Sequence, residues 1–226
     1  MSQRKALPTV PAYRPPTPSE YPPSRVGWAL QPHRAALLVH DMQRYFLAPY
    51  GDGDSPLPGV LAGIADLAAR CRAAGIPVVY TAQPAHQTPE QRGLLTDMWG
   101  EGIGAVSGSR PELELIAPEV EPGPDDVLLQ KWRYSAFQRS DLAERLAGWG
   151  RDQLVITGVY ASIGCLTTAV EAFMRDVQPF LVGDAVADFT RADHEHAIDY
   201  VARRCGVVTT VDQVLAAVGS VAEPAR

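Results

Sequence analysis

Apolar positions along the chain follow two patterns, short uninterrupted runs and longer segments that repeat every three to four residues. The run AALLV at 35–39 is typical of a strand buried on both faces. The segment 58–74 gathers its apolar side chains on one helical face, and Gly75 signals its end. The same patterns predict strands at 35–39, 77–82, 127–130, 153–158, 179–184 and 206–210, and helices at 58–74, 140–150, 165–175, 192–204 and from 211.

Strands and helices alternate along the chain, and most connections are short. Such β–α repeats form a parallel sheet with crossover helices on its faces. We therefore predict an α/β fold, a three-layer Rossmann-like arrangement of a six-stranded parallel sheet with helices on both faces. Residues 83–126 are too long for a simple connector, and a loop of that length in a compact domain is usually functional.

The domain organisation follows from length and proline content. The 226 residues suffice for one domain with a substantial core. Prolines crowd residues 1–32 and exclude a regular helix or a central strand there. Apolar side chains such as Tyr13 and Trp28 favour an extended arm, lying on the body or on a partner subunit, over a disordered tail. We expect an arm at 1–32, one main domain at 33–218 and a tail at 219–226.

Composition narrows the class of protein. The net charge of −6 argues against a nucleic-acid binder, because there is no basic excess to release counterions from phosphates. The three cysteines are widely spaced and form neither a disulfide pattern nor a zinc motif, which favours a reducing compartment. No signal peptide or membrane-spanning apolar stretch is evident. We expect a cytoplasmic protein that does not bind membranes.

Chemically useful side chains follow the predicted strands. In an open α/β sheet, ligands bind outside the carboxyl ends of the strands. The residues at those ends are Asp41, Gln83, Lys131, Tyr160 and Asp184, in chain order. A carboxylate, an amide, a lysine and a phenol would thus meet at one rim and outline a site.

Each of these residues also has a structural interpretation. Asp41 is either the cap of a turn or, if partly buried, a proton donor with a raised pKa. Lys131 is either a surface lysine or, between a buried strand and Trp132, a group that binds an anion. Arg92, in the long loop, could equally be a second anion clamp or a solvated charge.

No cofactor or metal is expected. No dinucleotide-binding glycine fingerprint follows the first strand. His194 and His196 are two residues apart in a predicted helix, so their side chains point to different faces and cannot jointly hold a metal.

Several stretches together resemble the isochorismatase-like hydrolase family, and in particular its isochorismatase branch. The matching stretches are LLVHDMQRYF (37–46), YTAQP (80–84), QRGLLTDMWGEG (91–102), KWRYSAFQRSDL (131–142), GVYASIGC (158–165) and PFLVGDAVADFT (179–190). The resemblance implies hydrolysis of the enol ether of isochorismate to pyruvate and 2,3-dihydro-2,3-dihydroxybenzoate, or of 2-amino-2-deoxyisochorismate in phenazine-type pathways. The product would serve a siderophore or another secondary metabolite.

The resemblance also implies roles for individual residues. Asp41 would protonate the methylene carbon of the substrate, and Lys131 would act beside it. Substrate contacts would come from Gln83, Arg92, Tyr160, Gly164, Phe46, Trp99 and Ser162, where Ser162 stands in place of a histidine common in the family. The peptide between Val159 and Tyr160 is expected to be cis. The partners implied are a small anionic substrate and a second copy of the chain, in a homodimer.

Cys165 raises the alternative of a cysteine amidase, a chemistry found elsewhere in the superfamily. In those enzymes the nucleophile lies six residues after the glycine at the strand end, and counting from Gly158 gives Gly164. A shift of one position turns a helical side chain by ~100° and would direct the thiol of Cys165 away from the pocket. We therefore expect Cys165 to pack in the core and the reaction to proceed without thiol attack. A non-catalytic member that only docks a partner is the remaining alternative.

Overall fold

One sheet of six parallel strands, in the order β3-β2-β1-β4-β5-β6, organises the computed structural model, which describes residues 7–51 and 55–219. The strands are β1 Ala35–His40, β2 Val78–Ala82, β3 Val127–Gln130, β4 Gln153–Val159, β5 Gln178–Ala187 and β6 Val207–Thr209. The helices are α1 Arg44–Leu47, α2 Leu57–Ala73, α3 Pro89–Arg92, α4 Leu95–Trp99, α5 Gly104–Ser107, α6 Leu142–Gly148, α7 Leu166–Met174, α8 Arg191–Arg204 and α9 Val211–Gly219.

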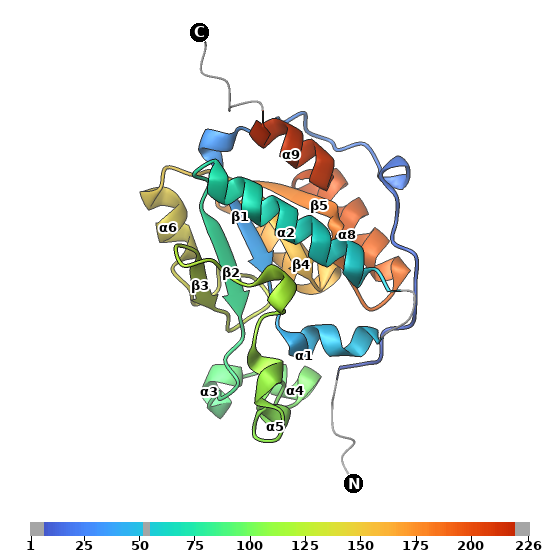
Figure 1. Cartoon of the computed structure of the whole chain (residues 1–226), viewed down its shortest axis with the longest axis vertical. Coiled ribbons are helices and arrows are strands. Elements are labelled where there is room, and N and C mark those ends of the chain that lie inside the picture. Colours follow the sequence, from blue (N-terminus) through green and yellow to red (C-terminus); the bar gives the residue numbers. More distant parts are fainter. Residues whose placement is uncertain (1–6, 52–54, 220–226) are drawn as a thin grey trace.

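Helices cover both faces of the sheet, as Figure 1 shows. Alternate side chains of a strand point to opposite faces, and both sets are apolar along β1. Leu37 and Val39 pack with α2 and α9, and Ala36 and Leu38 pack with α6, α7 and α8. The three-layer Rossmann-like α/β fold predicted from the sequence is therefore confirmed.

The strand order changes direction between β1 and β4. The chain leaves β1 toward β2 and β3 on one side, and returns to build β4, β5 and β6 on the other. In doubly wound sheets such a switch point leaves a crevice at the carboxyl ends of the two central strands. Those ends lie beside the short helices α3, α4 and α5, at the bottom of Figure 1.

Strand β5 is longer than its apolar pattern indicated. It runs to Ala187, so Asp184 lies within the strand and not at its end, contrary to the sequence prediction. The Asp184 carboxylate accepts a hydrogen bond of 2.9 Å from the backbone N–H of Val211, the first residue of α9. The residue that follows the strand is Asp188, which is fully buried.

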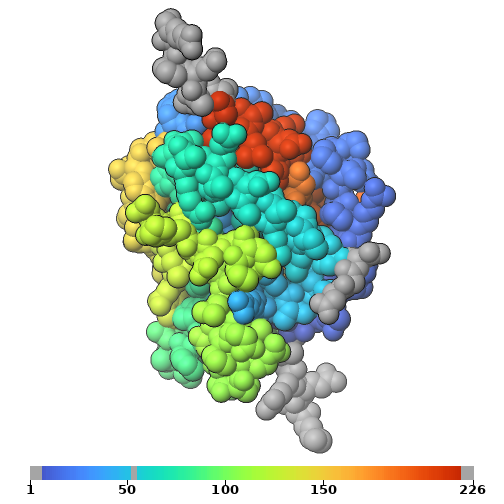
Figure 2. All heavy atoms as spheres, in the orientation of Figure 1, coloured from blue at the N-terminus to red at the C-terminus, as the bar shows by residue number. Residues whose placement is uncertain are grey.

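The long connection between β2 and β3 contains α3, α4 and α5 and then runs back toward the sheet. Its later part forms an antiparallel bridge between Ile116 and Gln43, just after β1. The backbone N–H of Ala117 donates to the carbonyl of Met42 at 2.9 Å. Figure 2 shows this yellow-green segment lying against the teal α2. The connection is thus fastened beside the end of β1, where the site lies.

The proline-rich segment before β1 lies along the body (blue in Figure 1). Within the part that the structure describes it has two short 3-10 turns, Pro18–Glu20 and Pro32–Arg34. Backbone hydrogen bonds attach Val10 to Pro49 at 2.9 Å and Arg25 to Ala202 at 2.8 Å. Apart from Gly219, the proposed tail at 219–226 lies outside the described residues.

Candidate active site

A cavity opens at the carboxyl ends of β1 and β4, at the switch point of the sheet. All of the site residues predicted from the sequence, except Ser162 and the strand-end candidate Asp184, line it: Asp41, Phe46, Gln83, Arg92, Trp99, Lys131, Tyr160 and Gly164. They come from the ends of β1, β2, β3 and β4 and from the long connection after β2. The positions at the strand ends accounted for Asp41, Gln83, Lys131 and Tyr160, which are up to 119 residues apart, whereas Phe46, Trp99 and Gly164 were implied by the family resemblance.

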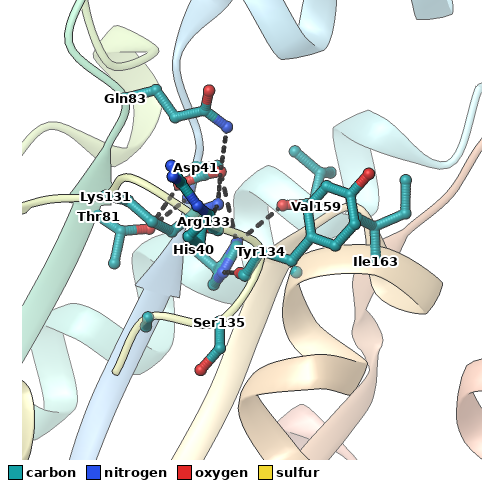
Figure 3. A network of polar contacts seen from close by, with 12 residues as sticks. His40, Asp41, Thr81, Gln83, Lys131, Arg133, Tyr134, Ser135, Val159 and Ile163 are labelled. Carbon is teal, nitrogen blue, oxygen red and sulfur yellow. Dashed lines mark hydrogen bonds and ion pairs between the residues drawn. The ribbon is translucent and has the colours of Figure 1, made fainter. Parts of the chain in front are cut away.

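A buried ion pair occupies the polar end of the cavity (Figure 3). Asp41 Oδ2 lies 2.8 Å from Lys131 Nζ, and their side chains are 5% and 2% exposed. Thr81 Oγ1 donates to Asp41 Oδ1 at 2.6 Å, and Gln83 Nε2 lies 3.4 Å from Oδ2. Asp41 has a backbone φ of +51°, in the left-handed region that side-chain-bearing residues rarely adopt. Backbone strain of this kind is concentrated at functional sites.

The protonation state of Asp41 reflects two opposing effects. Burial raises the pKa of the carboxyl, because the charged form loses water. The Lys131 ammonium, assisted by the Thr81 hydroxyl, outweighs burial and holds the pKa of Asp41 below its usual value. In the absence of substrate, Asp41 is therefore a carboxylate at neutral pH.

The neighbours of the ion pair are fixed by backbone contacts. Lys131 Nζ also donates to the carbonyl of Arg133 at 2.8 Å. Gln43 holds the strand end that carries Gln83, since its Oε1 accepts from the Gln83 N–H at 2.7 Å. Gln43 Nε2 donates to the carbonyls of Gln83 and Glu114, at 3.0 and 2.9 Å. The two strands and the returning connection are thereby joined around the carboxylate.

Aromatic rings form the apolar wall. Tyr160 stacks on Phe189 with ring centroids 4.0 Å apart, and Phe189 stacks on Trp99 at 6.1 Å. Phe46 meets Tyr160 edge-on at 6.2 Å. The Tyr160 hydroxyl donates to the Phe46 carbonyl at 2.7 Å, and burial raises its pKa, so the phenol stays protonated. The peptide between Val159 and Tyr160 is cis, as expected.

Arg92 supplies a second cation to the cavity. The residue is 6% exposed, and its Nε donates to the carbonyl of Gly100 at 2.7 Å. Among the described residues, no carboxylate lies within ion-pair distance of its guanidinium. A buried guanidinium without a carboxylate is suited to an anionic ligand.

Cys165 does not face the cavity. It is fully buried among apolar residues of the α7–α8 side, and its Sγ lies 3.8 Å from the Thr157 carbonyl. Burial raises the pKa of its thiol well above the usual value, which disfavours the thiolate that a nucleophile needs. Gly164 is the residue that lines the cavity at this point. The prediction that Cys165 packs in the core is confirmed.

Ser162 is the exception among the predicted contacts. It lies in the π-helical turn Ala161–Cys165, outside the cavity lining. Its backbone N–H donates to the buried carboxylate of Asp188 at 2.5 Å. The side chain that replaces the usual histidine is thus placed near the end of β5 rather than in the pocket wall.

Other cavity residues were not identified from the sequence. They are Leu7, His40, Tyr45, Leu95, Gly102, Tyr134, Val159, Ile163 and Phe189. Tyr134 follows Lys131 by three positions, and Phe189 follows β5, so the strand-end rule could have found both. Leu7 lies far from any strand end and gave no sequence signal. Thr81 lies within β2 and reaches the site because of the pleat.

Within 7–51 and 55–219, no cluster of three or more side chains is arranged to hold a metal ion. His194 is buried with Nε2 2.9 Å from the Gly183 carbonyl, whereas His196 is exposed, so the two point apart as predicted. None of the described helices has the length and apolar character needed to cross a bilayer.

Comparison with known proteins connects this geometry to a family. The isochorismatase of Bacillus subtilis (strain 168) is 50% identical over 210 residues, covering 93% of this chain and 66% of that protein, so the chain spans just under two thirds of that relative. The phenazine biosynthesis protein PhzD1 of Pseudomonas aeruginosa is 50% identical over 209 residues, covering 92% of this chain and 98% of that protein. The crystal structure of a cysteine hydrolase from Pseudomonas syringae aligns with a TM-score of 0.78 at 25% identity, covering 89% of this chain and 99% of that one. Residues 35–213 match the family model of the isochorismatase domain, and the chain belongs to the isochorismatase family.

Proposed function

We propose that this protein is a hydrolase that cleaves the enol ether of isochorismate, giving pyruvate and 2,3-dihydro-2,3-dihydroxybenzoate. The observation that carries the proposal is the buried Asp41–Lys131 pair in a cavity where position 164 is glycine. Such a site offers a carboxyl for proton transfer and offers no side-chain nucleophile at that position. The 50% identity to a protein named isochorismatase supports the same reaction.

The reaction begins with proton transfer from Asp41. The carboxyl gives its proton to the methylene carbon of the enolpyruvyl group, whose π electrons form the new C–H bond. Water adds to the resulting oxocarbenium carbon, and the surplus proton of that water returns to the Asp41 carboxylate. The hemiketal then collapses: its C–O bond to the ring breaks, its hydroxyl proton passes to the ring oxygen, and pyruvate and the diol are released. General acid catalysis of this kind contributes about 10²–10⁴-fold in rate.

Substrate binding supplies the protonated form of Asp41. Lys131 keeps the carboxyl ionised in the free enzyme. The substrate is a dianion, and its carboxylates in the cavity partly neutralise Lys131 and displace water. Both changes raise the pKa of Asp41 at the step that needs its proton.

The remaining side chains orient the substrate. Arg92 and Lys131 bind its carboxylates, and Gln83 donates a hydrogen bond near the reacting carbon. Phe46, Trp99 and Tyr160 form apolar walls against the ring. Gly164 lines the cavity with its backbone, and a side chain at this position would meet the ring of His40. The concentration of cations in a cavity of a protein with net charge −6 supports a small anionic substrate.

A second candidate substrate is 2-amino-2-deoxyisochorismate. It shares the enolpyruvyl group and thus the whole mechanism, and differs by an amine in place of a hydroxyl. The observation in its favour is that this chain spans 98% of a phenazine biosynthesis protein at 50% identity. A cysteine amidase is disfavoured because the Cys165 thiol is buried on the far side of the helix start.

The test is to incubate metal-free protein separately with isochorismate, 2-amino-2-deoxyisochorismate and nicotinamide, and to follow pyruvate and ammonia. The Asp41→Ala variant serves as the blank. We expect pyruvate from one or both of the first two substrates, none in the blank, and no ammonia from nicotinamide. The ratio of the two kcat/KM values identifies the substrate. Release of ammonia from nicotinamide without any pyruvate would overturn the proposal in favour of an amidase.

We further propose that the protein works as a homodimer in the cytoplasm. Large apolar side chains are exposed on its surface, among them Leu128 on the edge strand β3 and Met174 at the end of α7. The three cysteines are free, which suits a reducing compartment. Light scattering during gel filtration is expected to give twice the chain mass of 24.4 kDa, and a monomer at micromolar concentration would contradict the dimer.

A further inference from the structure

His40, the last residue of β1, contributes a side chain to the cavity that the mechanism above does not use. The ring is fully buried. Its Nδ1 lies 3.0 Å from the carbonyl oxygen of Val159, and its Nε2 lies 3.3 Å from the carbonyl oxygen of Tyr134. One imidazole therefore connects the end of β1 to the end of β4 and to the loop that carries Lys131 (Figure 3).

The same ring lies against the backbone of Gly164. A Cβ built on Gly164 would lie 2.0 Å from His40 Cε1, 2.7 Å from Nε2 and 2.8 Å from Nδ1. These distances are far shorter than the ~3.5–4 Å at which non-bonded heavy atoms rest. With the ring in its present place, position 164 accepts only glycine.

The ring has little freedom to yield. His40 pairs with Gly158 across the central strands, and both ring nitrogens face backbone carbonyls. Its backbone is crowded as well, because a Cβ on Gly158 would lie 2.1 Å from the His40 carbonyl oxygen. Rotation of the ring would break its contacts to Val159 and Tyr134, and Asp41 Oδ2 already lies 3.8 Å from Nδ1.

We propose that His40 is a positioning residue that determines the type of reaction. Its ring holds position 164 to glycine and donates its one N–H to one of the two backbone carbonyls that face it, so that no side-chain nucleophile can stand there and the substrate meets Asp41 and water. The statement that His40 determines the type of reaction rests on the proposed function, whereas the structural coupling of His40 to Gly164 does not.

The test is a double-mutant cycle on positions 40 and 164. His40→Asn keeps a donor close to the place of Nδ1, facing the Val159 carbonyl, and removes the ring atoms that crowd position 164. Gly164→Ala adds the single carbon that meets the ring. Both variants, their combination and the wild type are compared by urea and thermal unfolding and by kcat and KM for pyruvate release.

Gly183→Ala is the matched control. A Cβ on Gly183 would lie 2.6 Å from Cζ of Tyr21, so the substitution is similarly crowded, but by a residue other than His40. It is made in both the wild-type and the His40→Asn backgrounds. If His40→Asn merely made the whole fold less rigid, the loss of stability caused by Gly183→Ala would also become smaller in that background. If the contact is specific, only the loss caused by Gly164→Ala becomes smaller.

We expect Gly164→Ala in the wild-type background to lower kcat by about 100-fold, since a displacement near 1 Å at a catalytic site costs that much. In the His40→Asn background the same substitution lowers kcat less than about fivefold, and its effect on the melting temperature falls to less than half. Gly183→Ala lowers the melting temperature equally in both backgrounds. Rescue of kcat distinguishes positioning from a merely structural role, which would restore only the melting temperature.

Equal losses for Gly164→Ala in the two backgrounds would overturn the proposal, because the added carbon would then act on the substrate or the helix and not through His40. The proposal would also be overturned if His40→Asn reduced the loss of melting temperature caused by Gly183→Ala as much as the loss caused by Gly164→Ala. If the protein released no pyruvate from any substrate, the proposed function would fail, and the unfolding cycle would still decide whether His40 and Gly164 are coupled.

Discussion

Replacing Asp41 by asparagine removes the proton donor while preserving its shape. In the wild type, Oδ2 faces Lys131 at 2.8 Å and Oδ1 accepts from Thr81 at 2.6 Å. An asparagine in the same rotamer can direct its carbonyl oxygen to Lys131 and its amide group to Thr81 Oγ1. The cavity therefore keeps its form, and the change isolates the acidic proton.

The structure sets two magnitudes for this variant. Loss of the general acid is expected to lower kcat by about 10²–10⁴-fold, which corresponds to roughly 3–5 kcal/mol of activation free energy. Asparagine also leaves the Lys131 ammonium buried without its counter-ion, and breaking one side of a buried pair costs about 3–5 kcal/mol in free energy of unfolding. The bond from Lys131 to the Arg133 carbonyl persists and offsets part of that cost.

A second substitution separates the two effects. In the Asp41→Asn, Lys131→Met double variant both charges are gone, and replacing a whole buried pair by apolar groups is often neutral for stability. We expect urea unfolding to show a large loss in each single variant and most of that loss restored in the double variant. Pyruvate release, followed by coupling to lactate dehydrogenase, should stay at or below about 1% of wild type in Asp41→Asn and in the double variant, both of which lack the acid.

A folded Asp41→Asn variant that kept more than a tenth of the wild-type kcat would refute the assignment of Asp41 as the acid. A double variant as unstable as either single one would instead refute the ion-pair reasoning, and would indicate that Lys131 is held mainly by its backbone contacts.

Four further predictions concern the site and its neighbours. Because Lys131 lowers the pKa of Asp41, the wild-type kcat/KM should rise as pH falls toward that pKa. In Lys131→Ala the same rise should occur at higher pH. A pH profile of the same position in both proteins would contradict the coupling of Lys131 to Asp41. The Asp41 carboxylate stabilises the fold fully above the pKa it has in the unfolded chain, and this stabilisation is lost as pH falls through its lower folded pKa. The free energy of unfolding of Asp41→Asn, measured as a function of pH, should therefore fall less steeply in acid than that of the wild type. Cys165→Ala should leave kcat within twofold and lower the free energy of unfolding by about 1 kcal/mol, whereas loss of pyruvate release would restore the thiol as a candidate. Leu7→Ala removes an apolar contact of about 1 kcal/mol from the cavity wall and should raise KM about fivefold with little change in kcat, and an unchanged KM would exclude the arm from binding.

The strands could be located from the sequence because strands buried on both faces need continuous apolar runs, and β1, buried at all six positions from Ala35 to His40, covers its run AALLV and one residue more. The end of β5 was predicted too early, because a polar residue interrupts its apolar run. Its polar Asp184 looked like a strand end, yet the carboxylate is satisfied by the N–H of Val211, a partner 27 residues away. A contact of that range leaves no mark on the local pattern.

The parallel sheet and the chemistry at its strand ends were determined by the sequence itself. Alternating elements force a parallel sheet, and a parallel sheet brings Asp41, Gln83, Lys131 and Tyr160 to one edge whatever the details of packing. The register of Gly164 and Cys165 was likewise readable, because one helical position changes which way a side chain points.

Only the tertiary structure decided how these residues act on one another. The pKa of Asp41 depends on the 2.8 Å distance to Lys131 and on the water excluded from both, and neither follows from chain position. The entry of Leu7 into the cavity wall and the absence of Ser162 from it result from packing between distant segments. The contact of the His40 ring with Gly164 joins residues 124 positions apart by number, and no local rule relates them, because close packing is a property of the folded interior and not of the chain.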